Sequence, residues 1–118
     1  MTAEVKLETD TSFLAISHYH WINIQVHGVR VGKARVSISG RRLIINSITI
    51  FPEFQRSGYA RRVIHQLQED FEEITADRVR NSAKGFWEKM GFDDKRDGDY
   101  VWTAPRSEQT QNATMLRR

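Results

Sequence analysis

Residues 43–71 read LIINSITIFPEFQRSGYARRVIHQLQEDF, and this stretch decides the fold. Its first part, residues 43–51, is almost entirely apolar and rich in isoleucine, which is typical of a buried strand. Pro52 has no N–H group for a β-ladder, so we expect the strand to end there. From Ser57 onward the apolar residues recur at spacings of three and four, which predicts a helix; they are Ala60, Val63, Ile64, Leu67, Phe71 and Ile74.

The charges along this predicted helix are opposite to those that its dipole favours. A helix carries partial positive charge at its N-terminus, so acidic residues are favoured there and basic residues at the other end. Here Arg56, Arg61 and Arg62 lie at the start, and the acidic residues at the end are Glu69, Asp70, Glu72 and Glu73. An anion on the free N–H groups of the first turn would make the arginine cluster favourable. A solvent-exposed face without special function is the alternative, but the strand, the glycine turn and the arginines together favour a phosphate site.

The overall charge does not favour a nucleic-acid surface. The chain has 118 residues, of which 39% are hydrophobic and 28% charged, as in an ordinary single globular domain. The formal net charge is +3, and residues 104–118 contribute +2 of it. The body of the chain is therefore nearly neutral, whereas a nucleic-acid surface needs basic residues clustered on one face.

The absence of cysteine and of long apolar runs excludes further classes of protein. Without cysteine there are no disulfides, thiolate metal sites or cysteine nucleophiles. No apolar run approaches about 18 residues and no signal peptide opens the chain, so we expect a cytoplasmic protein without a membrane partner.

The N-terminal third predicts strands and one short helix. Val5 and Leu7 alternate with charged residues, as in an edge strand. Residues 10–18 predict a short helix capped by the Asp-Thr-Ser run at its start. Residues 21–38 predict a hairpin that turns at His27-Gly28.

The remainder predicts a strand, a helix and a closing hairpin. Residues 74–79 are short and apolar enough for a strand, and residues 82–90 predict a helix that Gly91 ends. Residues 92–103 predict a hairpin, and the polar residues 104–118 predict a disordered tail. This order indicates an α+β (mixed α/β) fold with helices packed on a sheet.

Two segments together resemble the GNAT superfamily of acetyl-coenzyme A-dependent N-acetyltransferases. QRSGYA, residues 55–60, matches the superfamily signature Q/R-x-x-G-x-G/A, and AKGFWEKMGF, residues 83–92, resembles a later helix and turn in the same order and spacing. The resemblance extends over residues 21–102, and the combination is far more specific than the signature alone. It implies a GNAT-like domain at residues 1–103, with a central, mostly antiparallel sheet and helices on its faces.

The resemblance implies acetyl-coenzyme A as cosubstrate and no metal ion. In such proteins the signature's backbone N–H groups hold the coenzyme pyrophosphate at the helix start, which by position is the cradle Gln55, Arg56, Ser57, Gly58, Tyr59, Ala60 and Arg61. The strand end before it, Ile48, Thr49 and Ile50, would pair with the pantetheine arm. Asn81 and Trp87 resemble the family's coenzyme-contacting asparagine and tyrosine, although Asn81 is one residue too close to Trp87.

The implied reaction is direct attack of a primary amine on the acetyl thioester, which needs a base and an acid. The sequence departs from the family at both positions. Trp87 stands where the family often has a tyrosine as general acid, and Ile44 and Thr75 stand nearest to the position of the carboxylate that often serves as general base. We therefore assign no catalytic residue. The substitutes, each with a simpler role in packing, a turn or the surface, are Tyr59, Glu53, His18, His20, His27 and His65.

The N-terminal helical region is reduced relative to the family, which places two helices where only residues 10–18 are available here. We therefore expect an open acceptor groove, suited to a protein lysine or N-terminus, or to a homodimer in which a second subunit completes the site. Three function classes remain: an active N-acetyltransferase, a non-catalytic acetyl-coenzyme A-binding regulatory module, and, least favoured, a small nucleic-acid binder.

Overall fold

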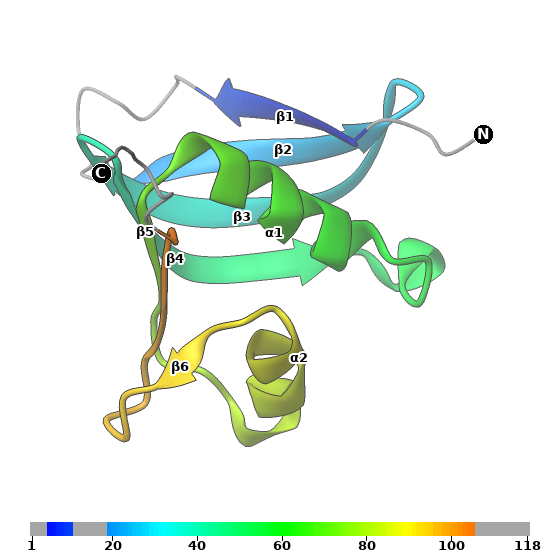
Figure 1. The fold of residues 1–118 in the computed structure, drawn as a ribbon. Coiled ribbons are helices and arrows are strands. Elements are labelled where there is room, and N and C mark those ends of the chain that lie inside the picture. The colour runs from blue at the N-terminus through cyan, green and yellow to red at the C-terminus, as the bar shows by residue number, and fades with distance from the viewer. Residues whose placement is uncertain (1–4, 11–18, 106–118) are drawn as a thin grey trace.

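A seven-stranded sheet with two helices forms the structure, a computed structural model that describes residues 5–10 and 19–105 (Figure 1). The strands lie in the order β1-β2-β3-β4-β5-β7-β6, and all neighbours are antiparallel except the parallel pair of β4 and β5. The expected mixed α/β fold with a mostly antiparallel sheet is therefore confirmed. The elements are β1 (Val5–Asp10), β2 (His20–Val26), β3 (Val29–Ser39), β4 (Arg42–Ile50), α1 (Tyr59–Asp70), β5 (Glu73–Ala76), α2 (Lys84–Lys89), β6 (Asp93–Asp94) and β7 (Tyr100–Thr103), with single 3-10 turns at Pro52–Phe54 and Asn81–Ala83.

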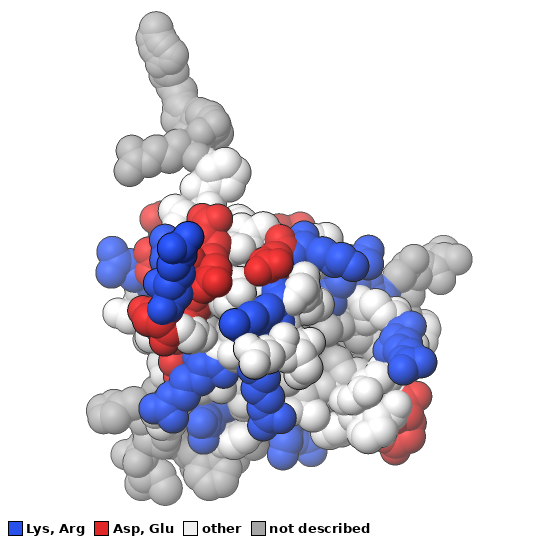
Figure 2. Space-filling view, turned by 90° about the horizontal axis from the view of Figure 1, so that it is seen from below, with Lys and Arg blue, Asp and Glu red and all other residues white. Residues whose placement is uncertain are grey.

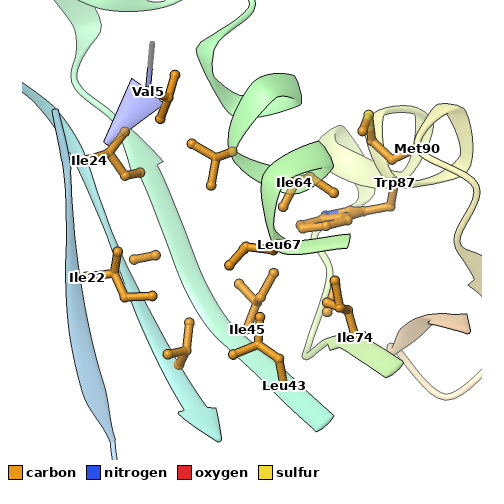
Figure 3. Close-up of a cluster of buried hydrophobic side chains, with 14 of the residues drawn as sticks. Val5, Ile22, Ile24, Leu43, Ile45, Ile64, Leu67, Ile74, Trp87 and Met90 are labelled. Atoms are coloured by element: carbon orange, nitrogen blue, oxygen red, sulfur yellow. The ribbon is translucent and has the colours of Figure 1, made fainter. Parts of the chain in front are cut away.

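The core lies between the sheet and the helices. α1 covers one face of the sheet, and the apolar side of α2 closes the same core beside it (Figures 1 and 3). Val63, Ile64 and Leu67 are the buried residues of α1, which confirms the spacing that predicted this helix. In β4, Leu43 and Ile45 are buried while Ile44 between them is 41% exposed, because alternate side chains of a strand point to opposite faces. The isoleucine run is therefore buried on one face only.

An irregularity in β4 separates two halves of this strand. The register passes from Arg35–Ser47 to Val36–Ile45, so Asn46 is an extra residue that bulges from the ladder with β3. The parallel pairing with β5 ends at Ile45–Ala76, and the Asp77 N–H group bonds to the Ile45 carbonyl at 3.0 Å. The second half of β4 pairs with β3 alone.

The predicted strands and helices that fall within the described residues were located correctly, but several of their ends differ. α1 ends at Asp70, since Phe71 is extended (φ −123°, ψ 150°), and Ile74 belongs to β5. Glu72 and Glu73 therefore lie outside the helix, and Glu72 pairs with Arg41 at 2.8 Å. The prediction overran because Phe71 and Ile74 continue the helical spacing of apolar side chains, although the backbone leaves the helix after Asp70.

The second half shows further differences. β5 ends before Asp77 rather than at residue 79, and residues 81–83 form a 3-10 turn before α2. The helix expected at residues 10–18 and the disordered tail expected at residues 104–118 lie mostly outside the described residues. In the described part of the chain, no helix is long and apolar enough to cross a membrane.

Gly32 permits the close approach of β3 to the second half of β4. A Cβ atom at this position would lie 2.3 Å from the Thr49 carbonyl oxygen, which is backbone and cannot swing away. We predict that Gly32→Ala lowers the free energy of unfolding by about 1–3 kcal/mol, measured by urea denaturation. Gly85→Ala is the control, because a Cβ atom there meets nothing within 4 Å and alanine favours the helix. Equal stability of Gly32→Ala and wild type would contradict the close approach.

Tyr100 ties the last strand to α2. Its hydroxyl group donates a hydrogen bond to Glu88 Oε2 at 3.2 Å, and the side chain is 1% exposed. Burial raises the pKa of Tyr100 above its ordinary value, and the nearby Asp94 and Glu88 carboxylates raise it further. A raised pKa in the folded state adds stability below the unfolded pKa of about 10, and this stability is lost as the pH rises through the folded value.

We therefore predict that the free energy of unfolding falls more steeply above about pH 10 in the wild type than in Tyr100→Phe. Urea denaturation of both proteins across this range measures the difference. The same slope in both proteins would show that Tyr100 does not contribute.

Candidate functional site

The start of α1 presents free backbone N–H groups. Gly58 is the N-cap residue with φ 79° and ψ 10°, a left-handed conformation that glycine adopts without strain, and no side chain caps the helix. The first helical hydrogen bond runs from the Arg62 N–H group to the Gly58 carbonyl at 3.1 Å. The N–H groups of the three residues between them therefore have no acceptor within the helix and are available to an anion.

A cavity of about 680 Å³ lies in front of this helix start, and we call it the helix cavity. Arg56 and Arg61 line it, none of its lining residues is acidic, and its apolar wall comes from β4 and α2. Arg56 itself has φ 67°, a strained conformation of the kind that is enriched at binding sites. The residues that line it are Ile48, Ile50, Phe54, Gln55, Arg56, Gly58, Tyr59, Ala60, Arg61, Ser82, Ala83, Phe86 and Trp87.

The second half of β4 has an edge that no strand pairs with, because β5 stops pairing with β4 at Ile45–Ala76 and a gap opens between the two strands. The N–H group of Phe51 bonds to Val31 of β3 at 2.8 Å, and successive residues of a strand direct these groups to alternate sides. Ile48 and Ile50 therefore direct theirs away from β3, into the gap. The Gln55 side chain donates a hydrogen bond to the Ile50 carbonyl at 2.8 Å and so ties the turn before α1 to this strand end. An extended ligand with amide groups can pair with the exposed edge as an added strand.

A second cavity, which we call the strand cavity, lies between the diverging ends of β4 and β5. Its volume is about 460 Å³, and it shares Ile48, Ala83 and Trp87 with the helix cavity. Its other lining residues are Ile45, Asn46, Ser47, Thr49, Ala76, Asp77, Arg78, Val79 and Arg80. The two cavities thus meet at the shared residues, beside the indole of Trp87.

Trp87 is held in the core at this junction. It is 5% exposed and makes edge-to-face contacts with Phe86 (5.1 Å between ring centroids) and Phe92 (4.9 Å). Figure 3 shows the indole lying beside Ile64, with Met90 directly after the end of α2. An indole N–H group donates hydrogen bonds but does not give up its proton, so Trp87 can shape the junction and cannot act as the acid.

A polar network of the strand cavity was not found from the sequence. Asn46 donates a hydrogen bond through Nδ2 to Asp77 Oδ2 at 3.3 Å, and Ser37 Oγ donates one to Asn46 Oδ1 at 3.4 Å. Arg78 and Arg80 line the same cavity. The sequence analysis placed Asp77 inside the strand predicted at residues 74–79, and it is the fold that brings Asn46 and Asp77 together.

Most of the predicted coenzyme residues line the helix cavity: Ile48, Ile50, Gln55, Arg56, Gly58, Tyr59, Ala60, Arg61 and Trp87. Thr49 lines the strand cavity instead, and Ser57 and Asn81 are exposed and line neither cavity.

Of the candidate acids and bases, Tyr59 alone lines one of the two cavities. His18 lies outside the described residues. The candidates and family positions that line neither cavity are Glu53, His20, His27, His65, Ile44 and Thr75.

The charges around the site are mainly positive. Figure 2 shows the end of the molecule that carries α2, with Lys and Arg side chains spread over it and acidic side chains gathered mainly on its left. Four arginines line the two cavities, and Asp77 is the one acidic residue that lines either. Such a surface favours anionic ligands. Among the described residues, no group of three or more His, Asp or Glu could hold a metal ion.

Comparison with known proteins identifies the family. A family model for an acetyltransferase (GNAT) domain matches residues 16–94. The fold is similar to that of an acetyltransferase from Thermus thermophilus, with a TM-score of 0.64 and 14% identity over 79% of this chain and 69% of that chain. It is also similar to the Bacillus subtilis N-acetyltransferase YlbP in complex with coenzyme A, with a TM-score of 0.57 and 19% identity over 70% of this chain and 66% of that chain.

A further Bacillus subtilis acetyltransferase, solved in complex with coenzyme A, matches with a TM-score of 0.58 and 10% identity over 88% of this chain and all of that chain (100%). At these identities the structural likeness shows the fold. No curated protein sequence matches this chain.

Proposed function

Because this chain belongs to the GNAT acetyltransferase family of acyl-coenzyme A-dependent N-acetyltransferases, we propose that it transfers an acetyl group from acetyl-coenzyme A directly to a primary amine in a ternary complex. The observation that carries this proposal is the meeting of two cavities at Ile48, Ala83 and Trp87. One cavity takes the coenzyme and the other takes the amine. Residues 1–103 form the acetyltransferase domain in this proposal.

The helix cavity suits the coenzyme at both of its ends. Its free N–H groups, Arg56 and Arg61 bind the pyrophosphate at the start of α1. The pantetheine arm then follows the free edge of β4, where Ile48 and Ile50 present backbone groups, and the thioester lies near Trp87. The coenzyme A bound to the two Bacillus subtilis neighbours supports this choice of ligand.

The chemistry in this proposal depends on positioning more than on an acid. Holding the amine and thioester together in a fixed geometry supplies a large part of the rate in many enzymes. Trp87 provides a rigid apolar wall for the acetyl group and no proton. A protein lysine or N-terminus is favoured as acceptor, because only residues 10–18 stand where the family has two helices beside the acceptor groove.

Gly58 provides a direct test of the coenzyme assignment. A Cβ atom at this position meets nothing within 4 Å, so a larger side chain would project into the space in front of the helix start. We predict that Gly58→Val lowers the affinity for acetyl-coenzyme A at least about tenfold, measured by titration calorimetry, while the fold is kept.

The matched control is Gly40→Val, because Gly40 also has a positive φ of 60° and open space around its Cβ position but lies at the β3–β4 turn. Both variants carry similar backbone strain, so their stabilities should fall together and only the Gly58 variant should lose binding. Unchanged affinity in Gly58→Val would remove the cradle assignment.

The alternative function is a regulatory module that binds acetyl-coenzyme A without chemistry, and Trp87 in place of an acidic tyrosine is the observation that favours it. Release of free thiol from acetyl-coenzyme A in the presence of an amine library separates the two functions. We predict amine-dependent thiol release that requires both substrates at once. Tight binding without release from any amine would instead support the regulatory module.

A further inference from the structure

One carboxylate of the strand cavity, that of Asp77, is held by the residue that bulges from β4. Asp77 Oδ2 accepts a hydrogen bond from Asn46 Nδ2 at 3.3 Å, and Asn46 Oδ1 accepts one from Ser37 Oγ at 3.4 Å. The first of these bonds exists because Asn46 is the extra residue of β4 and lies where β5 ends. The network orients Asp77 through one oxygen and leaves Oδ1 for a ligand.

Asp77 lines the strand cavity from the side of the sheet opposite to α1. Val36 and Ala76 are buried beneath the helices, and side chains alternate along a strand, so their neighbours Ser37 and Asp77 point to the other face. The helix cavity opens at the start of α1. Asp77 therefore approaches the shared residues from the side that the coenzyme does not occupy in the proposed function.

Two arginines line the strand cavity next to Asp77. Arg78 has φ 54°, and its N–H group donates a hydrogen bond to Asp99 Oδ1 at 3.1 Å, so the β6–β7 turn fixes this strained conformation. Arg80 follows two residues later, and both side chains are exposed. No other titratable residue lines this cavity. With one carboxylate and two guanidinium groups, the lining carries a net positive charge.

This balance of charge disfavours a simple ammonium ion. A lone cation would be attracted by Asp77 and repelled by both arginines, whereas an acceptor that carries its own anionic group next to the amine would be neutralised at both ends. A carboxylate also matches the paired donors of a guanidinium group, which bind it through charge-assisted hydrogen bonds.

We propose that the acceptor is a primary amine with an anionic group beside it, that Asp77 takes up the amine proton, and that Arg78 and Arg80 bind the anion. This inference rests on the proposed acetyl transfer and names the acceptor class for the same site. A lysine or N-terminal amine next to an acidic residue has this chemistry, and so does a free amino acid.

The proton balance of the reaction gives Asp77 a defined part. The acceptor arrives as an ammonium ion and loses one proton to Asp77, which later releases it to water. The neutral nitrogen then forms a bond to the carbonyl carbon of the thioester, and the carbon–sulfur bond breaks. The second amine proton passes to the departing thiolate, so the products are an amide and a free thiol.

Matched acceptors test the specificity. Wild-type protein with acetyl-coenzyme A would be assayed for thiol release with peptides that carry Glu or Gln next to the same amine, and with amino acids and their amides. We expect about tenfold higher kcat/KM for the anionic member of each pair, since charge-assisted bonds discriminate at this level. The peptide and amino-acid arms show which source is used.

Arg80→Gln should remove this preference, while Lys89→Gln, which removes an exposed cation outside both cavities, should keep it. Equal rates for the anionic and neutral members in the wild type would overturn the proposal. So would a preference that Arg80→Gln leaves intact.

Asp77→Asn tests the proton acceptor. We expect kcat/KM to fall about 100-fold, as for loss of a general base, with unchanged affinity for acetyl-coenzyme A by calorimetry. The remaining rate should rise with pH up to the pKa of the acceptor amine, because the neutral amine must then come from solution. A merely structural defect would not produce this rise. Asp93→Asn, an exposed carboxylate outside both cavities, is the control.

The outcomes separate this inference from the proposed function. If wild-type protein does not bind acetyl-coenzyme A, the proposed function itself fails. If it binds and turns over, but Asp77→Asn has the wild-type rate and pH profile, only the present inference is overturned. Binding without thiol release from any acceptor of the series would overturn the inference in favour of the regulatory module.

Discussion

The structure depends on the point at which β4 stops pairing with β5. Parallel pairing ends at Ile45–Ala76, and the extra residue Asn46 lets the second half of β4 follow β3 instead. Backbone N–H and C=O groups need partners when they are buried, so an unpaired strand edge inside a domain is costly unless a ligand or water satisfies it. Here the loss of pairing creates a gap between the strands, and both cavities border it.

The site is built largely from backbone. The free N–H groups at the start of α1, the edge of β4 at Ile48 and Ile50, and the left-handed Gly58 all contribute main-chain atoms. This explains how a short sequence signature can encode the half of the site that we propose for the coenzyme. Gly58 is the residue whose type matters for the backbone, because it adopts the left-handed conformation at the helix start. Arg56 and Arg61 add positive charge around backbone N–H groups that almost any residue could supply.

Side chains make the other half of the site, and they come from separate parts of the chain. Ser37, Asn46 and Asp77 lie on three neighbouring segments, and Trp87 enters from α2 to close the junction. The same indole is part of the hydrophobic core, where Phe86 and Phe92 pack against its edges. Core packing and the shape of the site are therefore coupled: a change at Trp87 alters both.

The sequence by itself determined the order of the elements and the helix-cavity half of the site. The isoleucine run, the glycine turn and the helical spacing are local patterns. They can be recognised in a single sequence because each depends only on residues a few positions apart. Even so, the apolar residues Phe71 and Ile74 continued the helical spacing beyond Asp70, where the chain had already left the helix. Only the tertiary structure decided where β4 and β5 separate, that Asn46 bulges, and that its amide meets Asp77. The Asn46–Asp77 hydrogen bond joins residues 31 positions apart. A local sequence pattern does not show which distant residues the fold brings together.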